Sequence, residues 1–174
     1  MDANIENRER LGYEIKVVDG VTYVGITDGI KVDNRNFHQR VKVVALLKGI
    51  TMSHIAAGFG CSVNNLSARL KNGKLGFDEQ RRIAEILEVG IVIRFVFADG
   101  ALFDGDTPGE MISGACRHAD ISQPQLAAMM GSSRQALRSR IINGHFTDLE
   151  LEKIAGHIGC EYENYFVLED GSRI

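Results

Sequence analysis

The sequence predicts a mainly α-helical protein with small β elements, built from two tandem copies of one small domain. The first observation is that the chain repeats itself at a constant offset of 71 residues without a gap. Ile55-Ala56-Ala57 returns as Leu126-Ala127-Ala128, and Asn72-Gly73 returns as Asn143-Gly144. The second observation is that apolar residues within each copy recur at helical spacing. A fixed period of this length indicates two copies of a domain rather than a solenoid of short units.

Length and charge are compatible with this organisation. The 174 residues give room for two units of about 60–70 residues, each just large enough to fold alone. The net charge of −3 is distributed unevenly: residues 1–39 carry −2, residues 40–100 carry +4 and residues 101–174 carry −5. Global charge therefore argues against nucleic-acid binding. However, Arg134, Arg138 and Arg140 crowd one short segment, and a local basic ridge is what a DNA-binding surface requires.

The composition favours a soluble, reduced protein without catalytic chemistry. The chain has no apolar run of about 18 residues and no basic-then-apolar start, so we expect neither membrane insertion nor secretion. Its three cysteines are odd in number and widely spaced, which favours a cytoplasmic location over a disulfide framework. The five histidines share no metal-ligand spacing, and no phosphate-cradling glycine loop is present. We therefore expect no metal, no cofactor and no enzymatic activity.

Residues 1–33 are expected to form an N-terminal arm and a β-hairpin. The β-branched runs at 13–18 and 21–26 flank Asp19-Gly20, which suits a two-residue turn with positive φ. The first copy of the domain then spans residues 34–103, and the second spans residues 104–174.

Each copy is expected to open with a helix. In the first copy this helix runs from about Asn34 to Lys48, because apolar residues from Phe37 onward recur on one face and Gly49 can end it. In the second copy the start is marked by Thr107-Pro108-Gly109-Glu110. Threonine suits the N-cap, proline suits the first helical position, and glutamate three residues after the cap completes a capping box.

Two short helices joined by a tight turn follow in each copy. In the first copy, Thr51 caps a helix, Gly60 makes the turn and Ser62 caps the next helix. Small Ala56 is placed where the two helices touch, and Leu66 with Leu70 would anchor the second helix inward. Such an arrangement is a helix-turn-helix, and it leaves the outward face of its second helix free.

The second copy repeats this pattern. Ser122 and Gln125 form a capping box, Gly131 makes the turn, and Ser133 caps a helix to about Ile142. A further helix is expected at about 78–88 and 148–158 in the two copies, followed by apolar β segments at 91–97 and 165–168. We expect these β segments to pair with one another or with a partner chain.

Residues 122–160, from Ser-Gln-Pro-Gln-Leu-Ala-Ala-Met-Met-Gly-Ser-Ser-Arg-Gln-Ala-Leu to Ile-Ala-Gly-His-Ile-Gly-Cys, resemble the phage repressor/Cro-type helix-turn-helix family. Residues 51–89 resemble a more diverged member. The resemblance implies tandem lambda-repressor-like helix-turn-helix domains that bind double-stranded DNA. It also implies a phage or mobile-element setting in the cytoplasm of a bacterial or phage-infected cell.

The resemblance also implies roles for individual residues. Gln123 matches a phosphate-binding position, Ser133 a phosphate- or base-contacting position, and Asn143 would face phosphate. Arg134, Gln135 and Ser139 match positions that reach base edges, and arginine and glutamine can bond guanine and adenine bidentately. The full candidate set for DNA binding is Gln123, Ser133, Arg134, Gln135, Arg138, Ser139 and Asn143 in the second copy, and Ser62, Asn64, Ser67, Lys71 and Lys74 in the first.

The chain departs from the family pattern in two ways. One additional residue lies between the anchor of the second copy's reading helix and its Asn-Gly stop. In the first copy, Met52 replaces the phosphate-binding glutamine and Val63 replaces a long polar reader. The first copy would therefore bind DNA weakly or serve as a docking module.

The sequence thus predicts a DNA-binding transcriptional regulator of the repressor type, with a homodimer through the β segments as an additional option. The alternative is a protein-interaction or inhibitor module of a mobile element. Such a module would keep the helix-turn-helix fold, lose DNA readout in one or both copies, and bind a host protein. The acidic second copy and Met52 favour this alternative.

Overall fold

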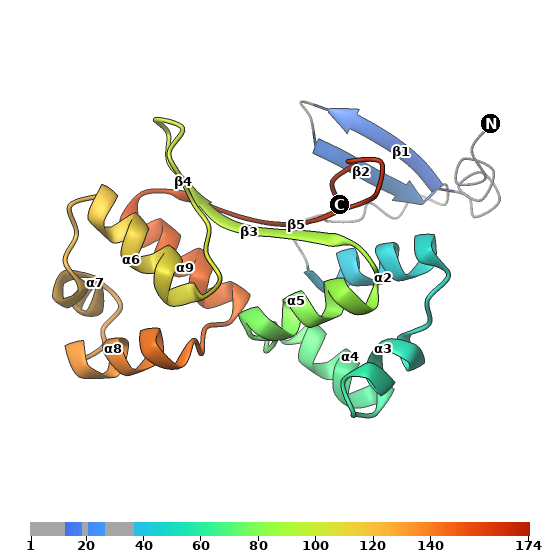
Figure 1. Ribbon diagram of the computed structural model, residues 1–174, viewed down its shortest axis with the longest axis horizontal. Helices are drawn as coiled ribbons and strands as arrows, with labels where there is room; N and C mark the ends of the chain where they lie inside the picture. The colour runs from blue at the N-terminus through green and yellow to red at the C-terminus, as the bar shows by residue number, and fades with distance from the viewer. Residues whose placement is uncertain (1–12, 19–20, 27–36) are drawn as a thin grey trace. The chain divides into compact units, whose positions relative to one another are not determined.

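A computed structural model of the chain describes residues 13–18, 21–26 and 37–174 (Figure 1). The described chain is mainly helical with a small three-stranded antiparallel sheet, which confirms the predicted fold class at this level. The predicted arm, the Asp19-Gly20 turn and the start of the first helix at Asn34 lie outside the described residues.

Two strands precede the helices. Strand β1 (Tyr13–Val18) pairs antiparallel with β2 (Val21–Ile26), in a register that runs from Tyr13↔Ile26 to Val18↔Val21. Alternating β-branched and aromatic residues in both segments suit such a ladder.

Helices α2 (Phe37–Lys48), α3 (Met52–Gly58), α4 (Val63–Lys71) and α5 (Phe77–Ile86) follow, and then strand β3 (Gly90–Val96). The predicted caps explain where the short helices begin. The Thr51 hydroxyl accepts a hydrogen bond from the His54 N–H at 3.2 Å, and the Ser62 hydroxyl accepts one from the Asn65 N–H at 3.2 Å. Gly60, between α3 and α4, has a φ of 66°.

The second copy contains β4 (Leu102–Phe103), which pairs with the end of β3, and helices α6 (Pro108–His118), α7 (Gln123–Met129), α8 (Arg134–Asn143) and α9 (Asp148–Ile158). Strand β5 (Glu161–Val167) comes last. The predicted capping box of Ser122 with Gln125 is formed, and Thr147 with Glu150 forms another. The box predicted at Thr107 with Glu110 is only half formed, because the Thr107 hydroxyl accepts from the Glu110 N–H while Glu110 Oε2 accepts from the Asp106 N–H instead of the Thr107 N–H. The local sequence therefore determines where these helices start.

The described chain divides into two compact units. The first unit holds the described residues up to Asn72 together with residues 82–91 and 165–174. The second unit holds residues 73–81 and 92–164. The units interleave the two copies, because the end of each copy belongs to the unit that holds the α-helices of the other copy.

Each unit has its own apolar core. In the first unit, Phe37 of α2 contacts Phe166 of β5 with ring centroids 5.4 Å apart, so a helix of the first copy packs on a strand of the second. Fully or almost fully buried residues of this unit are Val41, Val44, Ile55, Leu66, Leu70, Ile83, Leu87 and Phe166. Those of the second unit are Phe77, Phe95, Met111, Ile112, Leu126, Leu137, Phe146, Leu151 and Ile154.

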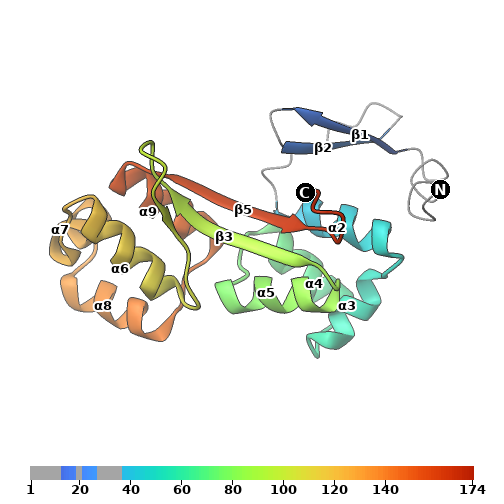
Figure 2. The same ribbon diagram turned by 45° about the horizontal axis from the view of Figure 1, so that its top comes forward.

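The sheet has the strand order β4-β3-β5, and the views in Figures 1 and 2 both show β3 and β5 side by side. The prediction that the β segments pair with one another is confirmed. A Cβ atom on Gly90 would lie 3.3 Å from Val167 Cβ, and Arg94 Nε lies 2.6 Å from Glu163 Oε2. Both contacts fit a single antiparallel register, in which Arg94 faces Glu163.

Residues at equivalent positions of the two copies face each other twice within the second unit. Gly76 forms an antiparallel β-bridge with Thr147, its equivalent at an offset of 71 residues. The register of β3 and β5 likewise sets Ile93 opposite Asn164, which is its equivalent. Both of these contacts between equivalent residues lie within the second unit.

A buried polar cluster surrounds Asn164 in the second unit. Asn164 is 8% exposed, and its Nδ2 donates to Gln80 Oε1 at 2.6 Å and to Asp148 Oδ1 at 2.6 Å. Gln80 is 1% exposed, and the Tyr162 hydroxyl donates to Asp148 Oδ1 at 2.6 Å. The hydrogen bonds of this cluster link residues of α5, α9 and β5 and satisfy the buried Asn164 Nδ2.

Within the described residues, no single helix is both long and apolar enough to cross a membrane, whereas α2 and α3 taken together as a bent pair meet the length and composition criteria.

The buried amide pair gives a first prediction. Replacement Asn164→Leu should lower the free energy of unfolding by roughly 1–3 kcal/mol, because it leaves the buried Gln80 Oε1 without its donor. Urea denaturation of the whole chain measures this loss. The double variant Gln80→Leu/Asn164→Leu should recover part of it, since both partners are then apolar. The hydrogen bond between the two amides would be refuted as the cause if Gln80→Leu/Asn164→Leu lost roughly a further 1–3 kcal/mol relative to Asn164→Leu, the same loss again.

Candidate nucleic-acid interface

The turn between α7 and α8 is fixed by local interactions. Gln125 Oε1 accepts from the Ser122 N–H at 2.8 Å, and the Ser133 hydroxyl accepts from the Ala136 N–H at 3.1 Å. Gly131 takes the left-handed conformation with a φ of 64°. Leu126 and Leu137 are buried, which fixes the inward sides of α7 and α8. The opposite side of α8 is therefore presented to solvent.

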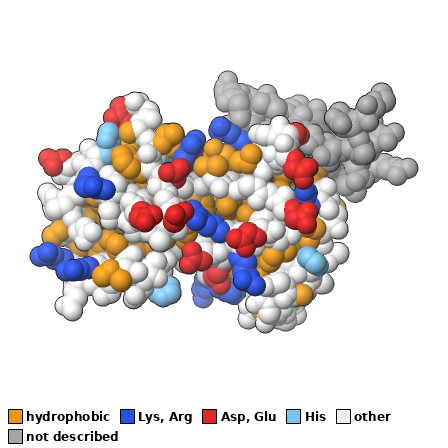
Figure 3. Space-filling model, viewed as in Figure 1, with side chains coloured by type: hydrophobic (Ala, Val, Ile, Leu, Met, Phe, Trp, Pro, Cys, Tyr) orange, Lys and Arg blue, Asp and Glu red, His pale blue; other side chains and the backbone are white. Residues whose placement is uncertain are grey.

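The outward side of α8 carries two arginines without carboxylate partners. Arg134, Gln135, Arg138 and Ser139 are all exposed, and their spacing places them on one helical face. Neither Arg134 nor Arg138 forms an ion pair with any other residue that the structure describes. Figure 3 shows basic side chains gathered over α8, at the lower left of that view. Such a face is electrostatically suited to an anionic ligand.

The structure excludes Arg140 from this face. Its Nη2 donates to Glu150 Oε1 at 2.5 Å and to the His145 carbonyl oxygen at 3.3 Å, and its guanidinium lies 4.6 Å from the Phe146 ring centroid. The expectation that Arg140 belongs to a basic ridge with Arg134 and Arg138 is therefore wrong. Arg140 instead connects α8 to the start of α9, and this contact orients α8.

Glu150 is the acceptor at the centre of this connection. Partial burial of Glu150 raises its pKa, but hydrogen bonds from the Thr147 N–H and hydroxyl and from Arg140, together with the charge of Arg140, outweigh burial. The net effect lowers the pKa of Glu150, so the carboxylate stays ionised and paired with Arg140 at neutral pH.

The remaining predicted residues of the second copy lie at the ends of these helices. Gln123 is the first residue of α7 and is partly exposed, whereas Asn143 is exposed at the end of α8. Ser133 is exposed as the N-cap of α8. Sequence reasoning did not single out Ile142, which is 71% exposed. Its position four residues after Arg138, on the outward face, was the signal that could have identified it.

The corresponding face of the first copy lies on α4. Ser62 caps the helix, Asn64 and Lys71 are exposed, and Ser67 is half-buried. These four residues share the first unit, whereas the exposed Lys74 follows α4 and belongs to the second unit. Uncharged Val63 and Ser67 of α4 stand at the positions equivalent to Arg134 and Arg138 of α8.

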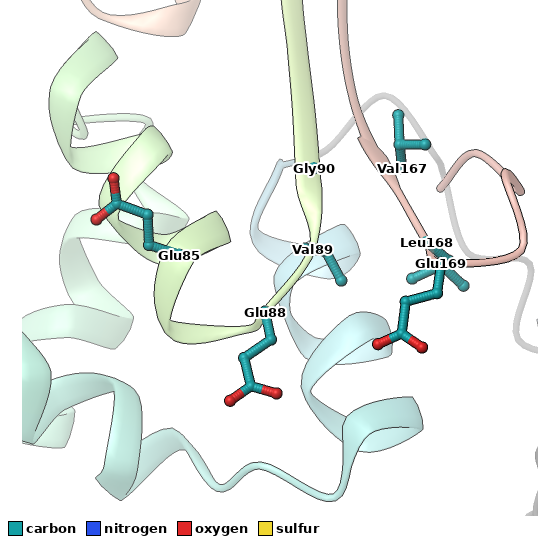
Figure 4. A pocket seen from close by; sticks show the side chains of 7 residues that line it. All are labelled: Glu85, Glu88, Val89, Gly90, Val167, Leu168 and Glu169. Atoms are coloured by element: carbon teal, nitrogen blue, oxygen red, sulfur yellow. The ribbon is translucent and has the colours of Figure 1, made fainter.

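A hollow in the first unit has the opposite electrostatic character. Its volume is about 380 Å³, and the side chains in Figure 4 include three carboxylates, those of Glu85, Glu88 and Glu169, around Val89 and Leu168. Glu169 pairs with Lys48 at 3.0 Å, but the other two acids still make the hollow unsuitable for phosphate. The outward faces of α4 and α8 therefore remain the candidate nucleic-acid interface.

Metal chemistry has no support in the described residues, where no group of three or more His, Cys, Asp or Glu side chains could hold an ion. Cys61, Cys116 and Cys160 are free thiols, and burial raises the pKa of Cys116 to about 11. Comparison of the chain with protein-family models, with curated proteins and with solved structures finds no match.

The contact between α6 and α8 yields a prediction about helix placement. A Cβ atom on the buried Gly109 would lie 2.7 Å from the Ile141 carbonyl oxygen, so Gly109→Ala must displace one of the two backbones. We expect a loss of roughly 1–3 kcal/mol in the free energy of unfolding, measured by chemical denaturation. Gly156→Ala in α9 is the matched control, because a Cβ there meets nothing within 4 Å and should be neutral or stabilising. Equal losses for both variants would contradict the close approach.

The Arg140–Glu150 pair predicts a pH dependence. Because the folded-state pKa of Glu150 is lowered, its stabilising effect is present above the ordinary value of about 4.5 and is lost as pH falls through the folded-state pKa. Glu150→Gln should therefore be less stable than the wild type at pH 7, and the gap should narrow below pH ~4.5. Thermal unfolding between pH 7 and pH 3 measures the gap. Glu152→Gln, on an exposed site of the same helix, is the control, and a gap that stays constant for Glu150→Gln would refute the assignment.

Proposed function

We propose that the chain is a sequence-specific double-stranded DNA-binding protein that carries two helix-turn-helix modules, α3–α4 and α7–α8. The observation that carries this proposal is the outward face of α8. There, two arginines that pair with no carboxylate among the described residues flank an exposed glutamine, on a helix whose inward side is anchored by buried Leu137. Such a helix is narrow enough to enter a major groove and polar enough to remain exposed without its ligand.

The chemistry of this face fits base readout. Arg134 and Arg138 can each donate two hydrogen bonds to guanine, and Gln135 can both donate to and accept from adenine. Asn143 and the backbone near Gly144, at the opposite end of α8, are suited to phosphate contacts that set the register of the helix. The network of Arg140 and Glu150 would hold the helix rigid while it reads.

A transcriptional regulator of the repressor type is the role that such a reader serves most directly. Two modules on one chain raise the effective concentration of the second contact once the first has formed. Because the outward faces of α4 and α8 differ, the preferred DNA site of a single chain should be asymmetric. A homodimer would instead prefer a longer palindrome.

The test is selection of bound sequences from a random pool of duplex DNA at near-physiological salt. The wild type should enrich a defined motif, and Arg134→Ala/Gln135→Ala should abolish it with a loss of roughly 1–3 kcal/mol per base contact. Arg117→Ala, which removes one exposed positive charge from α6, is the control and should leave the motif intact. Unchanged enrichment by Arg134→Ala/Gln135→Ala would refute readout by α8.

A second candidate function is recognition of a protein partner. Met129, Ile142 and Leu149 are 47%, 71% and 53% exposed, and large exposed apolar residues are typical of protein contacts. Their equivalents in the first copy are Gly58, Lys71 and Asp78, so these apolar residues are specific to the second copy. No enrichment of any DNA sequence by the wild type would favour this candidate.

A further inference from the structure

The outward faces of α4 and α8 place their positive charges at opposite ends. Arg134 and Arg138, early in α8, correspond to Val63 and Ser67 in α4. At the last turn the order reverses, because exposed Ile142 of α8 corresponds to exposed Lys71 of α4. The outward face of α4 therefore has no long basic side chain at the positions of Arg134 and Arg138, but it has Lys71 in its last turn.

A second lysine accompanies Lys71. Helix α2 packs against α4 within the first unit, and Lys42 of α2 is exposed like Lys71. Both ammonium groups act on His38, which α2 also carries. Burial lowers the pKa of His38, and the charges of Lys42 and Lys71 lower it further. The packing of α2 on α4 therefore places these two exposed lysines in one region of positive potential, in agreement with their shared effect on His38.

Within the described residues, no carboxylate pairs with either lysine of this positive region. Neither Lys42 nor Lys71 forms an ion pair with any residue in the part of the chain that the structure describes, whereas nearby Lys48 is paired with Glu169. In the second copy the equivalents of Lys42 and Lys71 are Ser113 and Ile142, which carry no charge. The region is therefore a property of the first copy alone.

We propose that Lys42 and Lys71 form a phosphate-binding surface through which the first copy contacts the DNA backbone without reading bases, so that sequence is read mainly by α8. Lysine binds phosphate as a point charge and carries no base preference by itself, in contrast to the planar donor array of arginine. This inference rests on the proposed function, since it assigns the two copies different parts in one DNA complex. Its ligand is the phosphodiester backbone of duplex DNA.

The test is the salt dependence of duplex binding by the full chain. Each phosphate contact contributes about 0.9 to the slope of log K against log salt concentration. Lys42→Ala/Lys71→Ala should therefore reduce the slope by about two, on the selected site and on unrelated duplex alike. The enriched motif should keep every position, because no base contact is removed. Arg117→Ala/Lys153→Ala removes two exposed charges elsewhere and is the matched control.

The outcomes separate this inference from the function on which it rests. A wild-type slope in Lys42→Ala/Lys71→Ala, or loss of motif positions in that variant, would overturn the assignment even if Arg134→Ala/Gln135→Ala abolishes the motif. Equal slope changes in the control variant would also overturn it, since the effect would then reflect net charge. Absence of any duplex binding by the wild type would overturn both proposals. Circular dichroism on each variant checks that the fold is unchanged.

Discussion

The antiparallel pairing of β3 with β5 is the constraint on which the rest of the structure depends. Each of these strands contributes residues to both compact units, so the two strands connect elements that are distant in sequence. Phe95 of β3 is buried in the second unit and Phe166 of β5 in the first, and each ring completes a core built largely by helices of the other copy. Each unit's core therefore contains an aromatic ring from both copies of the repeat, and neither copy forms a complete core by itself.

Helices α7 and α8 are positioned by interactions of two kinds. Capping by Ser122 and Ser133 and the glycine turn at Gly131 act within a few residues and define where α7 and α8 start. The Arg140–Glu150 pair acts across the loop between α8 and α9, and it fixes α8 against the start of α9. The first kind defines where each helix begins, and the second kind orients α8.

The sequence was sufficient for features that depend on neighbours in the chain. The caps at Ser122 and Ser133 and the exposed positions of Arg134 and Arg138 follow from spacing alone, and the structure contains them, whereas Glu110 bonds the Asp106 N–H and leaves the predicted box at Thr107 half formed. The sequence was insufficient to predict whether a polar side chain faces solvent or contacts another part of the fold. Arg140 resembles its neighbours in sequence, yet packing places Phe146 and Glu150 beside it. The interleaving of the units was equally hidden, because a repeat shows which residues are equivalent but not which copy they pack against.

The buried amide pair shows what a fused chain permits. In a homodimer every residue occurs twice, so a hydrogen bond between Gln80 and Asn164 could not be present on one side of a two-fold axis and absent on the other. A single chain is free of that duplication. It carries Gln80 and Asn164 at one pair of positions and the apolar Leu151 and Ile93 at the equivalent pair. Because the two copies are encoded separately in one chain, a substitution can change a residue in one copy without changing its equivalent in the other.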